Sequence, residues 1–243
     1  MVMRHFADIL GEVIENMDLS ICVETVTDLG DDLWKLSVCD CSTTLHAMPS
    51  TANRNLYASN SGTDYKITAI DHDVSITVES ETEPATGNYT LAMPAYMHGT
   101  PMEISAEIAK KQQDVSRYPL IWLLEIINTD ITGSYDPMSN IEMQPDARIF
   151  VLDYADYSAL STQLYDAPVR PMANLADRLT KEFVRQAVSD NPIRVNQIPY
   201  AKFGSNYTNA NTADRSSALL SWLVDHTGGV ELRLTIPIYK QIN

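Results

Sequence analysis

Residues 118–127 read Tyr118-Pro119-Leu120-Ile121-Trp122-Leu123-Leu124-Glu125-Ile126-Ile127 and are apolar almost throughout. An unbroken apolar run of this kind is typical of a strand covered on both faces or of a buried helix. The run is too short to cross a bilayer, which needs roughly 20 apolar residues. A second run follows at Ala147–Tyr154. We predict that the two runs pair at the centre of an antiparallel sheet, with Pro119 tolerated because it opens its strand.

The overall composition is that of a globular protein. The chain has 243 residues, of which 44% are hydrophobic and 20% charged, outside the range of disordered sequences. Its 17 basic and 32 acidic residues give a formal net charge of -15. This charge argues against a surface that grips phosphate backbones, but it suits a surface past which nucleic acid must slide without adhering.

Cysteine content and the first residues indicate a compartment. Three cysteines, an odd number, do not suggest a disulfide framework. The start of the chain carries Asp8, Glu12 and Glu15 and lacks the apolar core of a signal peptide. We therefore expect synthesis and assembly in a reducing cytoplasm, with no membrane partner.

The chain before residue 95 combines one helix with short strands. Residues 3–17 place apolar side chains at helical spacing. Residues 50–55 and 59–62 read as polar loop. Alternating, β-branched stretches occur at Ser20–Thr27, Leu33–Cys41, Tyr65–Ile70 and Val74–Val78. Short strands at such close spacing predict a small β-barrel or sandwich over residues 19–94.

From Ala95 the pattern turns helical. Thr100-Pro101-Met102-Glu103 is a helix-start signature, and the helix is expected to run to about Gln113. The longest helix is predicted over Pro168–Ser189, with Val184 on its apolar face. Strands are predicted at Ile193–Phe203 and at Val230–Ile238, whose alternation indicates a half-exposed strand. The predicted fold class is α+β: an antiparallel sheet flanked by helices, from residues 1–18 and 95–243, with the β domain of residues 19–94 inserted.

One group of side chains could bind a metal. Cys39 and Cys41 point the same way on a strand, and His46 follows. Structural zinc usually has four ligands, with two to four residues between paired cysteines. Here the spacing is shorter and the fourth ligand is missing, so buried cysteines are the favoured interpretation. A metal-stabilised module or metal-dependent enzyme using Cys39, Cys41 and His46 stays open as an alternative.

No other pattern has the residue types and the spacing that catalysis requires. His98 precedes a capped helix, Asp153 and Asp156 suit a solvated strand end, and Asp225-His226 suits a loop. Glycine-rich phosphate loops and a nucleophile elbow are both missing from the sequence. We predict no catalytic residue, no cofactor, no metal site and no enzymatic activity.

Several stretches resemble segments of the neck and tail-ring structural proteins of crAss-like and related short-tailed bacteriophages. In that family a Val-Cys-Asn/Asp strand opens an inserted β module and a Tyr-x-Ile/Val-Thr-x-Ile-Asp strand follows. A Gly-Thr-Pro helix start then precedes a Tyr-Pro-x-Ile-Trp-Leu strand. The matching stretches here are Asp32–Cys41, Tyr65–Asp71, His98–Pro101, Tyr118–Glu125, Phe150–Tyr154 and Pro171–Leu175. The resemblance covers most of residues 20–185, and the order of elements is similar to tail-terminator-like proteins.

The resemblance implies a non-enzymatic virion protein that assembles in the bacterial host cytoplasm. Its expected role is one subunit of a homo-oligomeric ring, twelvefold or sixfold, that joins portal to tail and lines the DNA exit channel. Portal and adjacent neck or tail ring proteins are the implied partners, and DNA would pass without specific binding. No catalytic residue or cofactor is carried over.

Features of the sequence also suggest where subunits would meet. Rings use heterologous contacts, and edge strands carry unpaired backbone groups that favour such contacts. We expect inter-subunit contacts at the loop Gly204–Arg215 and at the strand Val230–Ile238, and we expect the loop Asp130–Asn140 to reach a neighbour. A glycan-binding or adhesin role for the inserted β domain is a further alternative.

Overall fold

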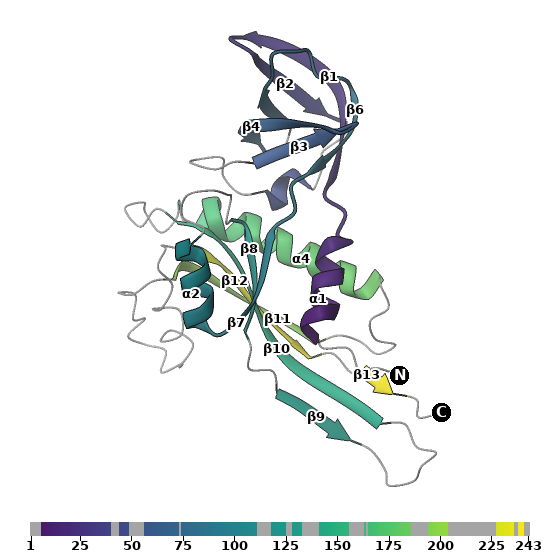
Figure 1. Ribbon diagram of the computed structural model, residues 1–243, viewed down its shortest axis with the longest axis vertical. Helices are drawn as coiled ribbons and strands as arrows, with labels where there is room; N and C mark the ends of the chain where they lie inside the picture. The colour runs from purple at the N-terminus through teal and green to yellow at the C-terminus, as the bar shows by residue number, and fades with distance from the viewer. Residues whose placement is uncertain are drawn as a thin grey trace.

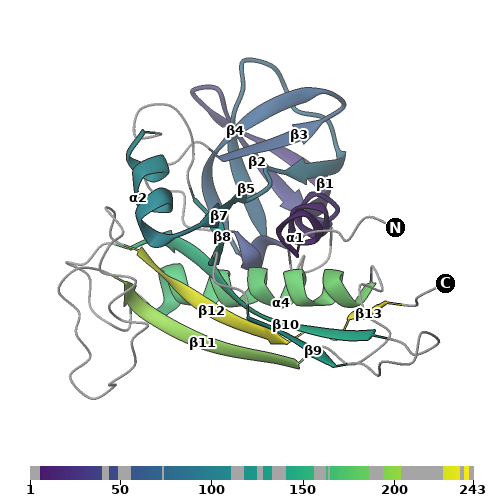
Figure 2. The ribbon, with the colours of Figure 1, turned by 60° about the horizontal axis from the view of Figure 1, so that its bottom comes forward.

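The computed structural model describes residues 6–39, 44–48, 56–72, 74–110, 118–124, 128–132, 141–155, 163, 165–185, 194–203, 227–235 and 238–240. These residues form a closed six-stranded antiparallel barrel and a second, larger sheet with helices on both faces (Figures 1 and 2). The prediction of a mixed α+β protein with a small β-barrel is therefore confirmed. No helix among the described residues has both the length and the apolar character that crossing a bilayer requires.

The barrel is built from six strands that all lie within residues 19–94. They are β1 (Ser20–Gly30), β2 (Leu33–Val38), β3 (Leu56–Asn60), β4 (Thr63–Asp71), β5 (Ser75–Glu79) and β6 (Gly87–Leu91), in the closed order β1-β2-β5-β4-β3-β6. Strands β3 and β6 were not predicted, because each is short and places only two apolar side chains inside. The division of the chain into two domains stays a prediction.

The second sheet is centred on β10. Its strands are β7 (Ala95–Gly99), β8 (Leu120–Leu124), β9 (Asn128–Thr132), β10 (Ile141–Tyr154), β11 (Arg194–Phe203), β12 (Thr227–Thr235) and β13 (Ile238–Lys240), and its main order is β11-β12-β10-β8-β7. Strands β8 and β10 pair antiparallel, with Ile121 opposite Val151, which confirms the predicted centre.

One part of the predicted sheet is wrong. The sequence predicts a helical pattern from Ala95, but residues 95–99 form β7, which runs parallel to β8, so the sheet is mixed. A parallel pair needs a crossover connection, usually a helix. Helix α2 (Pro101–Lys110) lies on that connection. The predicted helix start at Thr100 is confirmed, but the sequence pattern does not predict the strand before it.

Alternate residues of β10 enter two different apolar clusters. Ile149 and Val151 pack in the cluster that contains helices α1 (Phe6–Glu15) and α4 (Arg170–Arg185), which follows a π-helical turn at Tyr165–Val169. Phe150 and Leu152 pack with α2 on the other face. There Trp122 stacks on Phe150 with ring centroids 4.8 Å apart, and its indole N–H donates to the Gly99 carbonyl.

The first of these clusters is continuous from the barrel to the sheet. It includes barrel residues such as Leu36 and Tyr89, the short 3-10 helix η1 (Leu45–Ala47), α1, α4 and the sheet. Helix α4 lies between the barrel and the sheet in Figure 2. Its predicted apolar face is confirmed at Met172 and Leu179, but Val184 is 65% exposed, which corrects the prediction for that residue.

The predicted helix start at Thr100 is confirmed as a capping box. The backbone N–H of Thr100 donates to Glu103 Oε2 at 2.8 Å, and the backbone N–H of Glu103 donates to Thr100 Oγ1 at 3.4 Å. These donors lower the pKa of Glu103 below its ordinary value of 4.5, because the N–H and the hydroxyl of Thr100 favour the carboxylate. Helix α2 therefore begins at a fixed residue directly after β7.

Replacing the cap gives a first prediction. Thr100→Ala should lower the free energy of unfolding at pH 7 by about 1 kcal/mol. Because the pKa of Glu103 is lowered on folding, its contribution is present above pH 4.5 and is lost as the pH falls through the lowered pKa. Urea unfolding at several pH values measures this, and Thr86→Ala, an exposed threonine without a cap role, is the control. A deficit that stays constant at acid pH would contradict the contribution of the Glu103 carboxylate, and no deficit at pH 7 would contradict the capping role of Thr100.

Candidate interaction surfaces and the contacts that position them

The predicted cysteine chemistry is corrected by a disulfide. Cys22 on β1 and Cys39 after β2 are bonded, with Cα atoms 5.3 Å apart, although the sequence suggested no disulfide. The two strands pair antiparallel, with Val23 opposite Val38, so the next residues outward, Cys22 and Cys39, face each other. Counting register outward from the β1–β2 turn would place Cys22 opposite Cys41, and only the two register shifts of β1 bring it opposite Cys39.

The disulfide bears on the alternative metal site. Cys39 is bonded to Cys22 and so has no thiolate to offer a metal, and Cys41 lies outside the described residues. The His46 ring stacks near the His72 ring, with centroids 6.5 Å apart. Among the described residues, no three His, Cys, Asp or Glu side chains are grouped as metal ligands are. The metal alternative therefore loses one of its three ligands.

The remaining candidate residues do not come together. Asp153 is buried at the end of β10, which corrects the reading of a solvated strand end, and His98 is exposed on β7. Asp156, Asp225 and His226 lie outside the described residues, as do the loop Gly204–Arg215 and residues 133–140 of the second loop. Residues 130–132 belong to β9.

The predicted edge strand at Val230–Ile238 is wrong. Its main part is β12, which pairs with β10 on one side and with β11 on the other, so its backbone is not free. Val230, Leu232 and Leu234 are buried as the alternation suggested, but the polar residue between them, Glu231, is 0% exposed. The strand is therefore interior rather than half-exposed.

A buried ionic cluster explains the misleading alternation. Arg148 Nε on β10 and Arg233 Nε on β12 both donate to Glu231 Oε1, at 2.6 and 2.8 Å. The Arg148 guanidinium also lies 5.5 Å from the centre of the Phe150 ring. A buried carboxylate needs such partners, because desolvation penalises an unpaired charge. In the sequence, this cluster looks like an exposed polar face.

The accessible strand edges lie elsewhere in the sheet. Among the described strands, β11 pairs with β12 alone and so forms one margin. The outer half of β10, Ile141–Asp146, pairs with β9 and β13. We call these three segments the arm. Figure 1 shows the arm reaching beyond α1 and α4 at the end of the molecule opposite the barrel.

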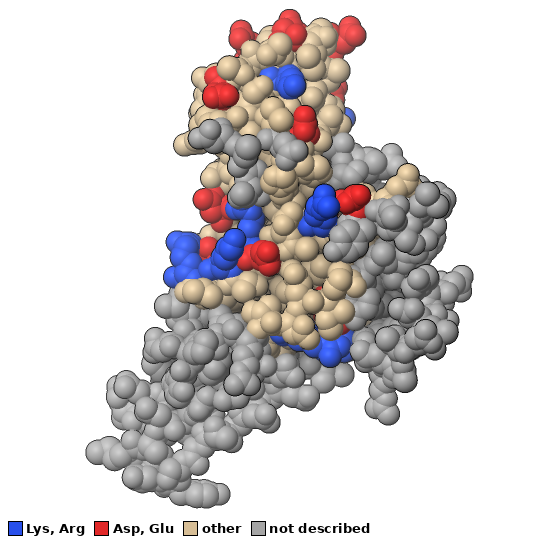
Figure 3. Space-filling view, turned by 180° about the vertical axis from the view of Figure 1, so that it is seen from behind, with Lys and Arg blue, Asp and Glu red and all other residues tan. Residues whose placement is uncertain are grey.

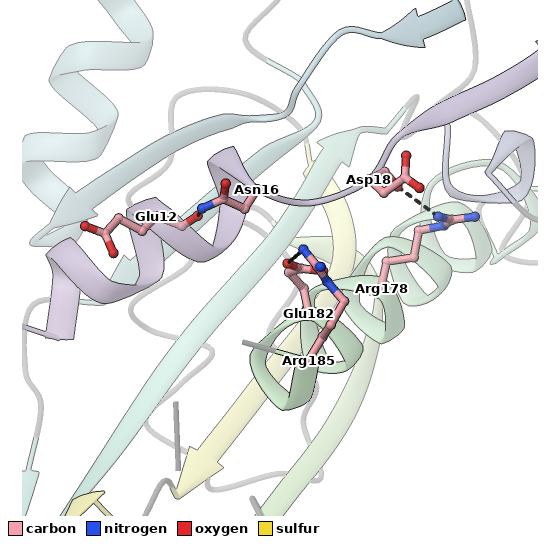
Figure 4. Close-up of polar contacts among 6 residues, drawn as sticks. All are labelled: Glu12, Asn16, Asp18, Arg178, Glu182 and Arg185. Carbon is pink, nitrogen blue, oxygen red and sulfur yellow. Dashed lines mark hydrogen bonds and ion pairs between the residues drawn. The ribbon is translucent and has the colours of Figure 1, made fainter. Parts of the chain in front are cut away.

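The barrel is fixed to helix α4 by a polar joint centred on Arg178 (Figure 4). Arg178 Nη1 donates to the Asp18 carbonyl at 3.1 Å, and Nη2 donates to Thr44 Oγ1 at 2.8 Å. The Thr44 hydroxyl in turn donates to the Ser20 carbonyl at 3.0 Å. One turn earlier, Asn174 Nδ2 donates to the carbonyl of His46 at 3.0 Å. These contacts tie α4 to the residue that leads into β1 and to the η1 region between β2 and β3.

Electrostatics at the joint favour the carboxylate form of Asp18, whereas burial lowers the pKa of Arg178 and the charge of Asp18 acts against that lowering. Hydrogen bonds from the hydroxyl and the backbone N–H of Ser20 lower the pKa of Asp18, and the positive charges of Arg178 and Arg185 lower it further. Arg185 forms an ion pair with Glu182 at 2.6 Å (Figure 4). Figure 3 shows Lys and Arg side chains where the barrel meets the sheet, whereas the barrel end is mostly acidic. On the face that Figure 3 shows, basic side chains therefore gather near the joint, with acidic ones among them, and the barrel end is mostly acidic.

Removing Arg178 tests whether the joint carries stability. Arg178→Met should lower the free energy of unfolding by about 2 kcal/mol, because it leaves the partly buried Thr44 hydroxyl and Asp18 carbonyl without their charged donor. Arg170→Met, which removes an exposed pair with Asp166, should change it by less than about 1 kcal/mol. Urea unfolding compares the two, and equal effects would rule out a special role for Arg178.

Removing the charge of Glu231 tests the buried cluster. Glu231→Gln keeps the volume but removes the buried carboxylate that Arg148 and Arg233 share, so the free energy of unfolding should fall by about 3 kcal/mol. The control is Glu79→Gln, which breaks the exposed pair with Lys66 and should cost less than about 1 kcal/mol. Chemical denaturation measures both, and a Glu231→Gln protein as stable as the control would contradict the cluster's importance.

Comparison with known proteins adds no relative to this picture. The chain matches no protein-family model, no curated protein and no solved structure. A functional conclusion therefore depends on the geometry described above. The barrel is fixed to a sheet, and the sheet carries a projecting arm and an open margin at β11.

Proposed function

We propose that this protein is a non-enzymatic structural subunit of a bacteriophage virion. In this proposal it forms one part of a closed homo-oligomeric ring in the neck or tail, between portal and tail. The observation that carries the proposal is the arm. A central strand of 14 residues extends past the helix-covered sheet and holds β9 and β13 there, so part of the sheet projects from the body (Figure 1).

The arm and the β11 margin suit the contacts of a ring. In a ring each subunit uses one face against a different face of the next subunit. Projecting strands and open margins provide such surfaces, because edge strands present backbone N–H and C=O groups that can hydrogen-bond to another subunit. The arm is built on residues 141–146 of β10. Strand β11 pairs with β12, and β12 pairs with residues 146–154 of β10. The two surfaces are therefore separate, as heterologous contact requires.

The joint at Arg178 and the charge of the chain support the same role. A barrel held by Arg178, Thr44 and Asn174 keeps a set orientation relative to the sheet, as a subunit in a repeating assembly needs. The formal net charge of -15 would let DNA pass through a lumen without adhering, because like charges repel. We propose portal and adjacent ring proteins as partners, in twelvefold or sixfold symmetry.

The disulfide is compatible with a virion. Disulfides persist on virion surfaces but are rare in reducing cytoplasm. Cys22, one member of the pair, is exposed on the barrel. In this proposal the chain assembles in the bacterial host cytoplasm, and the disulfide closes in the released particle.

Oligomeric state tests the proposal directly. The purified chain, alone and mixed with the portal protein encoded in the same genome, should form closed rings in light scattering and negative-stain imaging. Val195→Lys on β11 places a charge on the open margin and should shift the protein towards monomers. Val184→Lys, an exposed valine on α4, is the matched control.

Two outcomes would contradict the ring. The first is a chain that stays monomeric both alone and with the portal protein. The second is a gene neighbourhood that contains neither a portal nor a terminase gene.

A further inference from the structure

Strand β1 is longer than its partner β6, and part of one edge is left open. β1 pairs with β2 from Val23 to Gly30, but its pairing with β6 covers only Ser20–Val23. Beyond Val23, no described strand follows the second edge of β1. Alternate residues of a strand direct their N–H and C=O groups to each side, so residues 25–29 present unpaired backbone groups there.

The sequence explains why β6 stops at this point. Val23 and Thr25 pair with the adjacent residues Val38 and Ser37, so Glu24 is the extra residue of a β-bulge. Bulges end regular pairing and redirect side chains. On the other side, the residues before Gly87 include Pro84, which lacks an N–H and cannot continue a ladder. Strand β1 and the segment before β6 therefore separate where continued pairing would be expected.

The separation leaves an open hollow of about 550 Å³ on the barrel. Glu24, Thr25 and Val26 line it from β1, and residues 83–86 line it from the segment before β6. The hollow is wide open to solvent, so it suits a segment that lies along the surface rather than an enclosed small molecule. A hollow beside an open strand edge has the form used in β-augmentation, in which an extended peptide adds a strand.

We propose that this edge binds an extended cationic segment of another protein chain, as an added strand along residues 25–29. The lining contains two carboxylates, Glu24 and Glu83, and no Lys or Arg. Neither carboxylate has a hydrogen bond or ion pair with another part of the described chain. Lysine or arginine side chains of an added strand would pair with them, while the backbone groups of β1 supply the ladder.

Charge also selects against other occupants. A second copy pairing through the same edge would bring the Glu24 and Asp28 side chains of both copies together, and like charges opposite each other destabilise a strand pair. Nucleic acid would meet the same carboxylates with its phosphates. Thr25, Val26 and Thr27 favour strand pairing itself, since β-branched residues suit strands. The inference does not depend on the ring proposal.

Calorimetry on the full chain tests the proposal with synthetic peptides. The probe is the blocked peptide Lys-Thr-Val-Thr-Lys-Val-Lys. One comparison peptide has Glu in place of each Lys, and another has Pro in place of both Val residues. The lysine peptide should bind saturably, and both comparison peptides should bind at least about tenfold more weakly, because one loses the charge pairs and the other the backbone donors.

Variants locate the site. Glu24→Gln with Glu83→Gln should weaken binding of the lysine peptide about tenfold. The control, Asp8→Asn with Glu15→Gln on α1, changes net charge equally at exposed positions and should leave binding unchanged. Hydrogen exchange should show new protection at residues 25–29 when the lysine peptide is bound.

Several results would overturn the proposal. These are no saturable binding, equal binding of the proline peptide, equal loss in both double variants, or no protection at residues 25–29. A dimer of the chain that pairs through this edge would also overturn it. None of these results bears on whether rings form, so the two proposals fail separately.

Discussion

The structure depends on the burial of residues 149–152 of β10 between two apolar clusters and two neighbouring strands. These residues are fully buried, with Ile149 and Val151 on one face and Phe150 and Leu152 on the other. A strand in this position cannot slip by one residue without reversing both faces. The register of β8 and β12 is therefore set, and with it the positions of α2, α4 and the arm.

The strongest parts of the sequence were predicted because burial and capping leave local signals. β8 is apolar at every position, and the capping box uses residue types that few other structures need. The weaker parts involve partners far apart in sequence. Glu231 looks solvent-exposed until Arg148, more than eighty residues earlier, is brought beside it. β7 looks like the approach to a helix until β8 pairs with it.

Sites were harder to predict than elements for the same reason. The joint at Arg178 combines residues from α4, from the segment before β1 and from the segment before η1, and none of these positions forms a motif. The open edge of β1 follows from a difference in strand lengths and from a bulge at Glu24, which become visible only once β6 is placed. The Cys22–Cys39 pair was hidden in the same way, because it depends on two register shifts between β1 and β2.

The apolar cluster shared by the barrel, α1, α4 and the sheet has a consequence for cooperativity. Leu45 and Met48 of the barrel segment and Phe183 of α4 belong to one continuous cluster. Removing the barrel would expose the residues of α4 and α1 that it covers, and the isolated barrel would expose its own base. The two parts are therefore expected to unfold together in a single calorimetric transition. The strand topology separates the barrel from the sheet, but the shared apolar cluster makes their unfolding cooperative.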